Sequence, residues 1–407
     1  MIDPVLQPYV DMLPLALLAF FAALLLTPLV GFIAEKYHFV DLPATMRKRT
    51  DKTLEQRLHD NVKPRLGALA VLIPFILIAT TQIPMTTQLS GLFLGLIILT
   101  VVGVIDDRYE LSGGVQFGFQ ILAAVIVVVT GTTIPAISVA GLDLDFTGWQ
   151  TALNLGSFVY NMTLPADIIT ILWIVTLVNA LNWVCGIDAL GEGMTIIAAV
   201  TMTILSVRFG ANELALIPFL LGFGVLGFLP YNYPPSKIIG GTAGHGYGFV
   251  LAVLSILIAA QSGSGGNGPK LTTAIIILSI PLIDMIWVLI NRMRNHKTVN
   301  ILKLFSISGR EHLHHRLMDA GFSAKQTLYI ETSAMAIIAL VAFQFGGFNT
   351  GLVAGIAVIT ALIVAFTLIS LRNRRNSRSS KAIVKKPDGP QPPIVDTGPT
   401  PEERFAY

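Results

Sequence analysis

The chain has 407 residues, of which 53% are hydrophobic and 13% are charged, and its formal net charge is +3. Soluble domains carry roughly 25% charged residues, so this composition excludes a soluble globular protein and indicates a polytopic membrane protein. A single cysteine, Cys185, excludes an intramolecular disulfide. The first fourteen residues contain two aspartates and no Lys or Arg, so we expect a retained first helix and no cleavable signal peptide.

Apolar runs long enough to cross a bilayer, about 17 to 25 residues each, recur along the chain. They predict an all-α polytopic membrane protein with about eleven transmembrane helices. The predicted helices cover residues 12–34, 67–83, 89–105, 117–133, 163–181, 190–207, 213–229, 246–262, 272–290, 326–344 and 349–371.

The loops between these runs differ in their content of Lys and Arg. Of the 27 such residues, 25 lie in one alternate set of loops and in the tail after Leu371, and the other set holds only Arg208 and Lys270. Cytoplasmic loops are enriched in Lys and Arg. We therefore predict an N-terminus outside the cell and a cytoplasmic C-terminus.

Two segments are predicted to be other than transmembrane helix. Apolar and polar residues alternate between Ile137 and Phe146, which predicts a short β-hairpin on the outer face. Residues 372–407 are first basic and then proline-rich, a composition typical of disorder. The predicted domains are a membrane domain over 1–371 and a disordered cytoplasmic tail over 372–407.

Two adjacent carboxylates, Asp106 and Asp107, lie where one apolar run ends and the next begins. An ionisable residue at a membrane boundary is costly to keep, so by default it marks a functional site. Paired carboxylates also bind Mg²⁺, usually together with substrate phosphates. The alternative is a pair of solvated acids in a short cytoplasmic loop.

The segment NALNWVCGIDAL carries three polar side chains at the inner end of the fifth predicted helix. Asn179 and Asn182 are three residues apart and share a helix face, and Asp188 follows them. These side chains suit a polar ligand. Helix capping beside Gly186 is the alternative explanation.

The segment GREHLHHRL combines histidines with arginine. His312, His314 and His315 lie beside Arg310, and imidazole with guanidinium suits a diphosphate. A solvated basic loop near acidic lipid is the alternative. A zinc site is disfavoured, because no nearby Cys or spaced acid completes a ligand set.

All of these polar segments fall on the predicted cytoplasmic face. A glycine-rich loop, Gly227 to Gly248, joins them there, and its backbone N–H groups are able to approach an anion closely. Random polar interruptions would be distributed over both faces. Their convergence predicts one site at the membrane boundary, which one substrate reaches from the lipid and another from the cytosol.

The order of the motifs resembles the polyprenyl-phosphate N-acetylhexosamine-1-phosphate transferases, the membrane family that contains MraY, WecA and TagO. DDRYELS is similar to the family's DDxxxLS, and NALNWVCGIDAL, GFLPYNYPPSKI and REHLHHRL resemble three further family motifs. The resemblance runs from Asp41 to about Gly321, and its histidine motif is closest to the WecA and TagO branch. The matching residues of the first cytoplasmic loop are Asp41, Pro43, Arg47, Lys48, His59, Pro64, Arg65 and Gly67.

The resemblance implies a reaction at the cytoplasmic face of a bacterial cell membrane. A sugar-1-phosphate is transferred from a UDP-sugar to undecaprenyl phosphate or another polyprenyl phosphate, and UMP is released. The expected group is GlcNAc-1-phosphate, and the product serves the biosynthesis of cell-envelope polysaccharide. The implied cofactor is Mg²⁺. The implied partners are the UDP-sugar, polyprenyl phosphate and membrane lipid, with no nucleic acid, and a homodimer is left open.

The resemblance also assigns roles to residues of this chain. The implied catalytic residues are Asp106, Asp107, Asp188 and His312, with Asp106 as the base and Asp107 and Asp188 also as metal ligands. The residues implied to bind substrates are Asn179, Asn182, Asn232, Arg310, His314, His315 and Arg65.

The sequence departs from the family pattern at four positions. Cys185 and Thr242 stand where the family has aspartates, and the second of these aspartates is a Mg²⁺ ligand. Gln116 stands where a Lys is expected, and Gly309 where an Asp precedes the arginine of the histidine motif. A non-catalytic relative that keeps the lipid-phosphate and nucleotide groove is therefore the alternative function. A transporter is a third, favoured only by Asp284 within the ninth predicted helix.

Overall fold

The computed structural model describes residues 3–43, 61–139, 142–156, 158–261, 271–305, 307 and 309–344. The predicted helix at 349–371, the predicted tail at 372–407 and the matching residues Arg47, Lys48 and His59 lie outside these ranges.

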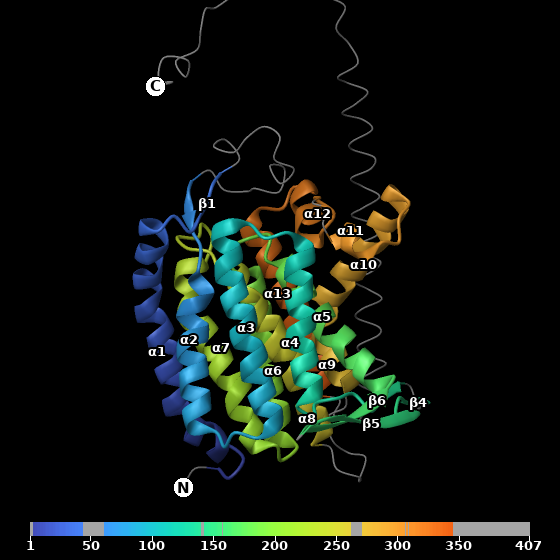
Figure 1. The fold of residues 1–407 in the computed structure, drawn as a ribbon. Helices are drawn as coiled ribbons and strands as arrows, with labels where there is room; N and C mark the ends of the chain where they lie inside the picture. Colours follow the sequence, from blue (N-terminus) through green and yellow to red (C-terminus); the bar gives the residue numbers. More distant parts are fainter. Residues whose placement is uncertain are drawn as a thin grey trace, which may run out of the picture.

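The described residues form a mostly helical bundle (Figure 1). Ten of the predicted apolar runs lie wholly or almost wholly within these ranges; nine of them overlap one helix each, and the run at 272–290 overlaps two. The helices before residue 262 are α1 (Gln7–Lys36), α2 (Gly67–Gln82), α3 (Thr87–Tyr109), α4 (Gly113–Val129), α5 (Ala166–Val184), α6 (Leu190–Arg208), α7 (Asn212–Asn232), the 3₁₀ turn η3 (Thr242–Gly244) and α8 (His245–Ala260). After it come α9 (Leu271–Ile277), α10 (Ser279–His296), α11 (Ile301–Phe305), α12 (Leu313–Asp319) and α13 (Ala324–Gln344).

Five helices in the described part of the chain are long and apolar enough to cross a membrane, namely α1, α3, α5, α6 and α7. The pair α9 and α10 adds a sixth if it is one broken span, and α2, α4 and α8 are shorter apolar helices. The fold is that of a polytopic membrane protein. The number of eleven spans stays a prediction.

The ninth predicted helix is not continuous, which corrects the prediction of a single span over 272–290. The chain bends by 75° between α9 and α10, and Leu278 separates the two helices. A Pro at the third position of α10, Pro281, has no N–H to donate, so it fits a new first turn better than a helix interior. The bend directs α10 toward the polar end of the bundle (Figure 1).

Helix α8 lies in the interior of the bundle and packs chiefly against α5, α3 and α6. Its sequence is apolar on every side, as expected for a helix surrounded by others, and most of its residues are buried. Close packing needs glycine at two places: a Cβ on Gly248 would lie 2.7 Å from the carbonyl oxygen of Leu177, and one on Gly95 would lie 2.4 Å from the Phe249 ring. This core fixes the ends of α3 and α5 relative to the start of α8.

Three two-stranded antiparallel sheets lie at the ends of the bundle. Strands β3 (Ala136–Val139) and β4 (Leu142–Asp145) pair within the segment where alternation predicts a hairpin, and β5 (Trp149–Leu155) pairs with β6 (Phe158–Leu164) beside them. The second pair was not predicted. Strands β1 (Val40–Asp41) and β2 (Lys63–Pro64) pair at the opposite end of the bundle (Figure 1).

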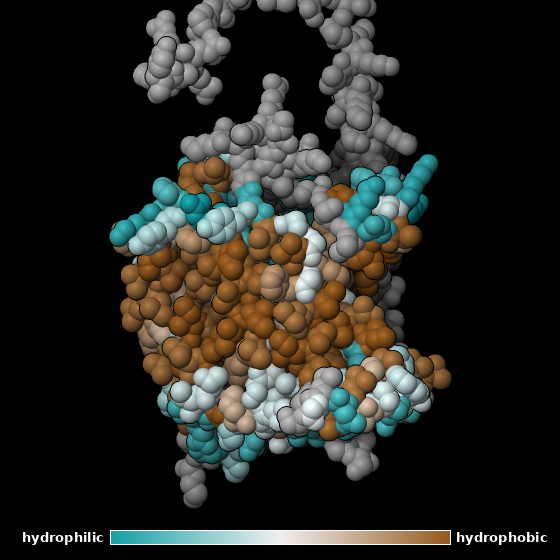
Figure 2. All heavy atoms as spheres, in the orientation of Figure 1, coloured by the Kyte–Doolittle hydropathy of each residue, from teal (hydrophilic) through white to brown (hydrophobic). Residues whose placement is uncertain are grey.

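On the face that Figure 2 shows, an apolar belt lies between two polar ends. Many large side chains in this belt are exposed, including Leu25 at 73% and Leu77 at 60%, as expected for a surface that faces lipid rather than water. The end that carries β1 and α12 is the end at which the predicted site segments meet (Figure 1).

Candidate functional site

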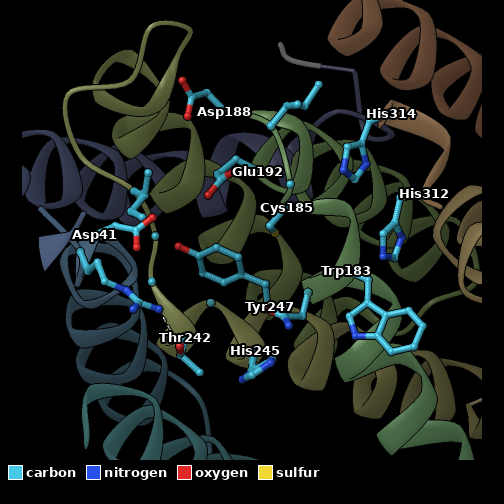
Figure 3. A pocket seen from close by; sticks show the side chains of 18 of the residues that line it. Asp41, Trp183, Cys185, Asp188, Glu192, Thr242, His245, Tyr247, His312 and His314 are labelled. Carbon is cyan, nitrogen blue, oxygen red and sulfur yellow. Dashed lines mark hydrogen bonds between the residues drawn. The ribbon is translucent and has the colours of Figure 1, made fainter. Parts of the chain in front are cut away.

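A pocket of about 530 Å³ lies at this polar end (Figure 3). Its walls come from β2, the end of α3, the turn between α5 and α6, the loop after α7 and the histidine segment. Eight of the eleven predicted site residues line it: Arg65, Asp106, Asn182, Asp188, Asn232, His312, His314 and His315. Asp107, Asn179 and Arg310 are not among its lining residues. The structure thus brings together segments separated by more than 200 positions of sequence.

Asp106 is buried in the last turn of α3 and accepts hydrogen bonds from three uncharged groups. Its Oδ1 accepts from the backbone N–H of Leu111 and from Nε2 of Gln116, both at 2.8 Å, and its Oδ2 accepts from the Thr242 hydroxyl at 2.6 Å. Gln116 and Thr242 are two of the four positions at which the sequence departs from the family pattern. Both departures therefore act on one carboxylate.

Asp107 is paired with a cation of the chain itself. Its Oδ1 lies 2.8 Å from Nη2 of Arg65 and accepts the backbone N–H of Thr242 at 2.9 Å. Its Oδ2 is buried without a hydrogen-bond partner, and the whole side chain is 0% exposed. Arg65 also donates to the Thr242 hydroxyl at 3.3 Å, so Thr242 connects the two acids and the arginine.

Asp188 is held by a lysine that the sequence patterns did not single out. Nζ of Lys63 lies 3.0 Å from each oxygen of Asp188 and 2.7 Å from the Ser236 hydroxyl. Ser236 donates to Asp188 through both its backbone N–H, at 2.9 Å, and its hydroxyl, at 2.8 Å. Both carboxylate oxygens of Asp188 are therefore occupied by donors of the protein.

These contacts decide how the predicted acids fit Mg²⁺, which proteins usually hold by one or two carboxylates together with substrate phosphates. Oδ2 of Asp107 fits, because it is a buried carboxylate oxygen with no donor. Asp188 does not present a free oxygen, because Lys63 and Ser236 occupy both. Within the described ranges, no three His, Cys, Asp or Glu side chains are grouped to hold a metal. Of the three predicted acids, Asp107 is therefore the one with an oxygen left for an ion, although its side chain does not line the pocket.

The three predicted asparagines have different surroundings. Asn182 lines the pocket. Asn179 is turned into the bundle, where its Nδ2 donates to Oε1 of Gln120 at 2.6 Å. Asn232 accepts the backbone N–H of Ala189 at 2.7 Å and thereby ties the end of α7 to the start of α6. Asn179 and Asn232 thus position backbone and helices around the pocket.

Cys185, the third departure, lines the pocket at the end of α5 (Figure 3). Its Sγ donates to the carbonyl of Leu181 at 3.2 Å, and a Cβ on Gly191 would lie only 2.2 Å from this sulfur. The surrounding protein and the neighbouring Glu192 raise the pKa of the Cys185 thiol well above its usual value. A thiol rather than a thiolate is therefore present near neutral pH, which disfavours metal binding by Cys185.

The histidine segment closes the other side of the pocket. His312 is the residue before α12, and its Nδ1 lies 2.7 Å from Oδ2 of Asp284 on α10. His314 and His315 follow on the first turn of α12 and are buried. Arg310 binds Asp319 at 2.9 Å on the partly exposed outer side of this segment. The predicted histidines and Arg310 therefore divide between the inside and the outside of the segment.

Sequence reasoning missed several residues of this site. Lys63 and Glu192 line the pocket, and Ser236 binds Asp188 and Lys63. None of the three belongs to a pattern that marks it, since a single Lys, Ser or Glu in a polar segment is common. Asp284 was noticed as an acid inside an apolar run and favoured a transporter. Its partner in the structure is His312, so this acid belongs to the histidine segment.

Gly241 offers a test of the acid cluster. Its φ is +75°, and a Cβ there would lie 2.2 Å from Oδ2 of Asp107. We expect Gly241→Ala to displace Asp107 and to lower the free energy of unfolding by roughly 1–3 kcal/mol. Gly244, three residues later, has nothing within 4 Å of an added Cβ and a helical φ, so Gly244→Ala is the matched control. Equal thermal unfolding of the two variants would contradict this close approach.

The histidines of α12 predict a pH dependence. Burial lowers the pKa of His314 well below its usual value, and burial with the neighbouring Arg310 lowers that of His315 to about 4. An unfolded histidine takes up its proton near pH 6.5, so between about pH 6.5 and 4 the unfolded state binds more protons than the folded state. We expect the free energy of unfolding to fall as the pH falls through this window.

Thermal unfolding of the parent and of His315→Gln between pH 7.5 and 4.5 checks this expectation. The variant should lose stability less steeply on acidification, because one of the two buried histidines no longer titrates. His296→Gln, at the exposed end of α10, should follow the parent curve. A His315→Gln curve parallel to that of the parent would rule out this source of acid sensitivity.

Comparison with known proteins gives a consistent result. Residues 89–259 match the family described as "Glycosyl transferase family 4". A Bacillus subtilis protein named "Probable undecaprenyl-phosphate N-acetylglucosaminyl 1-phosphate transferase" is 30% identical over 309 residues, which cover 75% of this chain and 77% of the relative.

Two further relatives have similar names. A Yersinia pestis "Undecaprenyl-phosphate alpha-N-acetylglucosaminyl 1-phosphate transferase" is 31% identical over 312 residues, 72% of this chain and 75% of the relative. A Mycobacterium leprae "Decaprenyl-phosphate N-acetylglucosaminephosphotransferase" is 28% identical over 392 residues, 89% of this chain and 90% of the relative. The similarity therefore extends well beyond the residues that the family match covers.

Proposed function

Because this chain belongs to the polyprenyl-phosphate N-acetylhexosamine-1-phosphate transferase family, we propose that it transfers GlcNAc-1-phosphate from UDP-GlcNAc to a polyprenyl phosphate and releases UMP. The chain is a multi-pass protein of the bacterial cell membrane. The names of its relatives support the sugar and the lipid class, and the UDP-linked donor is part of the proposal. We also propose that the chain is more similar to the WecA and TagO branch of the family than to MraY.

The observation that carries the proposal is the meeting of Asp106 and the histidine segment at one pocket, at a polar end of the bundle. In the reaction, an oxygen of the lipid phosphate attacks the donor phosphorus that carries the sugar. The bond from this phosphorus to the bridging oxygen of UMP breaks, and UMP leaves. Asp106, which lines the pocket, accepts the proton of the lipid phosphate, and the deprotonated phosphate oxygen is then the nucleophile.

The charges around the pocket suit two phosphorylated substrates. Lys63 and Arg65 each line it and are already oriented by Asp188 and Asp107. The Arg65 guanidinium bonds Asp107 and Thr242 through Nη2, and its remaining N–H groups are the donors for a diphosphate. The three N–H groups of Lys63 already point at Asp188 and Ser236, so Lys63 would act on a diphosphate through its charge. Mg²⁺, when bound at Asp107 with the diphosphate, would supply further neutralisation of the phosphate charge.

We further propose that the pocket opens to the cytoplasm and that the paired strands β3 to β6 lie outside the cell. The unequal distribution of Lys and Arg supports this orientation. The strands and the pocket lie at opposite ends of the bundle, with the apolar belt between them (Figures 1 and 2). Eleven spans, an N-terminus outside and a cytoplasmic C-terminus complete this proposal. Labelling of the variants Asp143→Cys and Lys237→Cys, which replace exposed residues at the two ends, in intact cells would show which end is outside.

A non-catalytic relative is the second candidate, and one observation favours it. Asp106 and Asp188 are both fully engaged by donors of the protein, and Thr242 supplies a hydroxyl where a further carboxylate would strengthen binding of Mg²⁺. Such a protein would bind the nucleotide or the lipid phosphate without converting them.

Mass spectrometry of the lipid fraction separates the two candidates. The purified protein, given undecaprenyl phosphate, Mg²⁺ and UDP-GlcNAc, should form a polyprenyl diphosphate that carries one GlcNAc. UDP-GalNAc and UDP-MurNAc-pentapeptide are the comparison donors. Binding of UDP-GlcNAc with no lipid product from any donor would support the non-catalytic relative. Absence of both binding and product would contradict both candidates.

A further inference from the structure

The three histidines of the histidine segment, His312, His314 and His315, differ in the hydrogen-bond partners of their ring nitrogens. Nδ1 of His312 lies 2.7 Å from Oδ2 of Asp284. In contrast, both ring nitrogens of His314 and Nδ1 of His315 are buried without a hydrogen-bond partner. Of the three, His312 is therefore the one whose ring is oriented by a carboxylate.

Asp284 binds the His312 region twice. Its Oδ2 faces the imidazole, and its Oδ1 accepts the backbone N–H of Leu313 at 2.7 Å. Asp284 is 2% exposed, and in the described part of the chain the His312 ring and the Leu313 N–H are the groups that hydrogen-bond this buried acid. One acid thus fixes both the start of α12 and the ring that precedes it.

A second contact from α10 holds the approach to this ring. Nε of Arg292 lies 3.0 Å from Oε2 of Glu311, the residue before His312, and its guanidinium lies over the Trp183 ring at 4.9 Å. The Trp183 ring meets the His312 ring in an edge-on arrangement at 5.6 Å. On its other side His312 stacks on His314, with 5.5 Å between the ring centroids and 7° between the planes.

We infer that Asp284 is a positioning residue that holds His312 with Nδ1–H toward the acid and Nε2 free for the substrate. Nδ1 and Nε2 lie on opposite edges of an imidazole, and His312 lines the pocket. A carboxylate on Nδ1 selects this tautomer and stops the ring from rotating. The inference rests on the proposed function, in which the donor diphosphate occupies the pocket and Nε2 of His312 meets it.

The first test is a double-mutant cycle on turnover. Asp284→Asn keeps the size of the side chain, but its NH₂ group must face one of two N–H donors, His312 or Leu313. We expect kcat to fall by roughly 10²-fold in the parent. In the His312→Gln background the same change should alter kcat less than about twofold, because the group through which Asp284 acts is gone.

Glu331→Gln is the matched control. Glu331 on α13 is a buried acid as well, lies close enough to Asp284 to interact with it electrostatically, and has no hydrogen-bond partner for either oxygen. Its replacement should leave kcat within about twofold of the parent, since it makes no contact with His312. A loss in Glu331→Gln as large as that in Asp284→Asn would overturn the specific role of Asp284.

A second measurement does not depend on turnover. In the parent labelled with ¹⁵N-histidine, the His312 signal, assigned by its loss in His312→Gln, should show the proton on Nδ1. In Asp284→Asn the proton should move to Nε2 in at least part of the molecules. A parent ring protonated only on Nε2 would overturn the inference.

The two measurements keep the inference separate from the proposed function. A parent without turnover would contradict the proposed transferase, and the ¹⁵N signals would still decide whether Asp284 fixes the tautomer of His312. Equal losses of kcat from Asp284→Asn in both backgrounds would show a general structural role and would overturn the inference.

Discussion

Replacing Asp106 by Asn is expected to lower turnover by roughly 10²- to 10⁴-fold while the fold remains intact. The Asn carbonyl can stay at the place of Oδ1, where the N–H groups of Leu111 and Gln116 both donate. Its NH₂ group then faces the Thr242 hydroxyl, which can turn from donor to acceptor. A loss of turnover therefore reports the loss of the negative charge and of the base.

The control for this variant is Gln116→Glu, which keeps Asp106 and changes one of its donors. A second acid 2.8 Å from Asp106 would repel it. We expect this variant to unfold at a lower temperature, whereas Asp106→Asn should unfold close to the parent. Turnover of Asp106→Asn within about threefold of the parent would contradict a role for Asp106 as the base.

Replacing Arg65 by Met is expected to be among the most destabilising single changes in the site. The side chain of Asp107 is 0% exposed, and Arg65 is the cation that pairs with it at 2.8 Å. Removal of one partner from a buried ion pair costs about 3–5 kcal/mol, because the other charge stays buried and uncompensated. Thermal or denaturant unfolding in detergent measures this loss.

Two variants show whether the cost comes from the buried charge. Arg65→Met combined with Asp107→Asn should regain much of the stability, since no charge then remains to be compensated. Arg310→Ala breaks a pair whose side chains are 33% and 46% exposed, and should cost less than about 1 kcal/mol. An Arg65→Met variant no less stable than Arg310→Ala would contradict the account of Asp107.

The helices were predictable because apolar runs of membrane length are a local property of the sequence. The predicted run at 89–105 and the observed α3 (Thr87–Tyr109) differ only at the ends, where the last turn of α3 carries the acid pair. The break between α9 and α10 was not predicted, because hydropathy does not register a bend within an apolar segment. Pro281 was the available signal, but prolines occur within α1, α2 and α7 without a break.

The residues of the site were predictable as a set, and their individual partners were not. Composition and motif order placed Asp106, Asp188 and His312 at one face. The ion pair of Lys63 with Asp188 joins residues 125 positions apart, and no local pattern specifies it. Asn179 and Asn182 are three residues apart and were predicted to share a helix face. In the structure Asn182 lines the pocket, whereas the amide of Asn179 is buried against Gln120. The packing of α5 against its neighbours decides this difference, and the sequence of α5 alone does not specify it.

Two of the four departures from the family pattern, Gln116 and Thr242, have a common physical explanation in the structure. A Lys at position 116 and an Asp at position 242 would place opposite charges around Asp106. Gln116 and Thr242 give Asp106 two neutral donors instead, so both charges are absent together. Both oxygens of Asp106 are therefore hydrogen-bonded without a charge on either of these two donors. Whether it also keeps its activity is the question that matters most for this chain.

Release of UMP from radiolabelled UDP-GlcNAc by the purified protein answers this question most directly. The assay needs undecaprenyl phosphate, with reactions that lack the lipid, that contain EDTA, or that use Asp106→Asn. We predict UMP release that requires the lipid and Mg²⁺ and is lost in the variant. UMP release that is equal with and without the lipid, or that is unchanged in Asp106→Asn, would contradict the proposed transfer and the part that Asp106 plays in it.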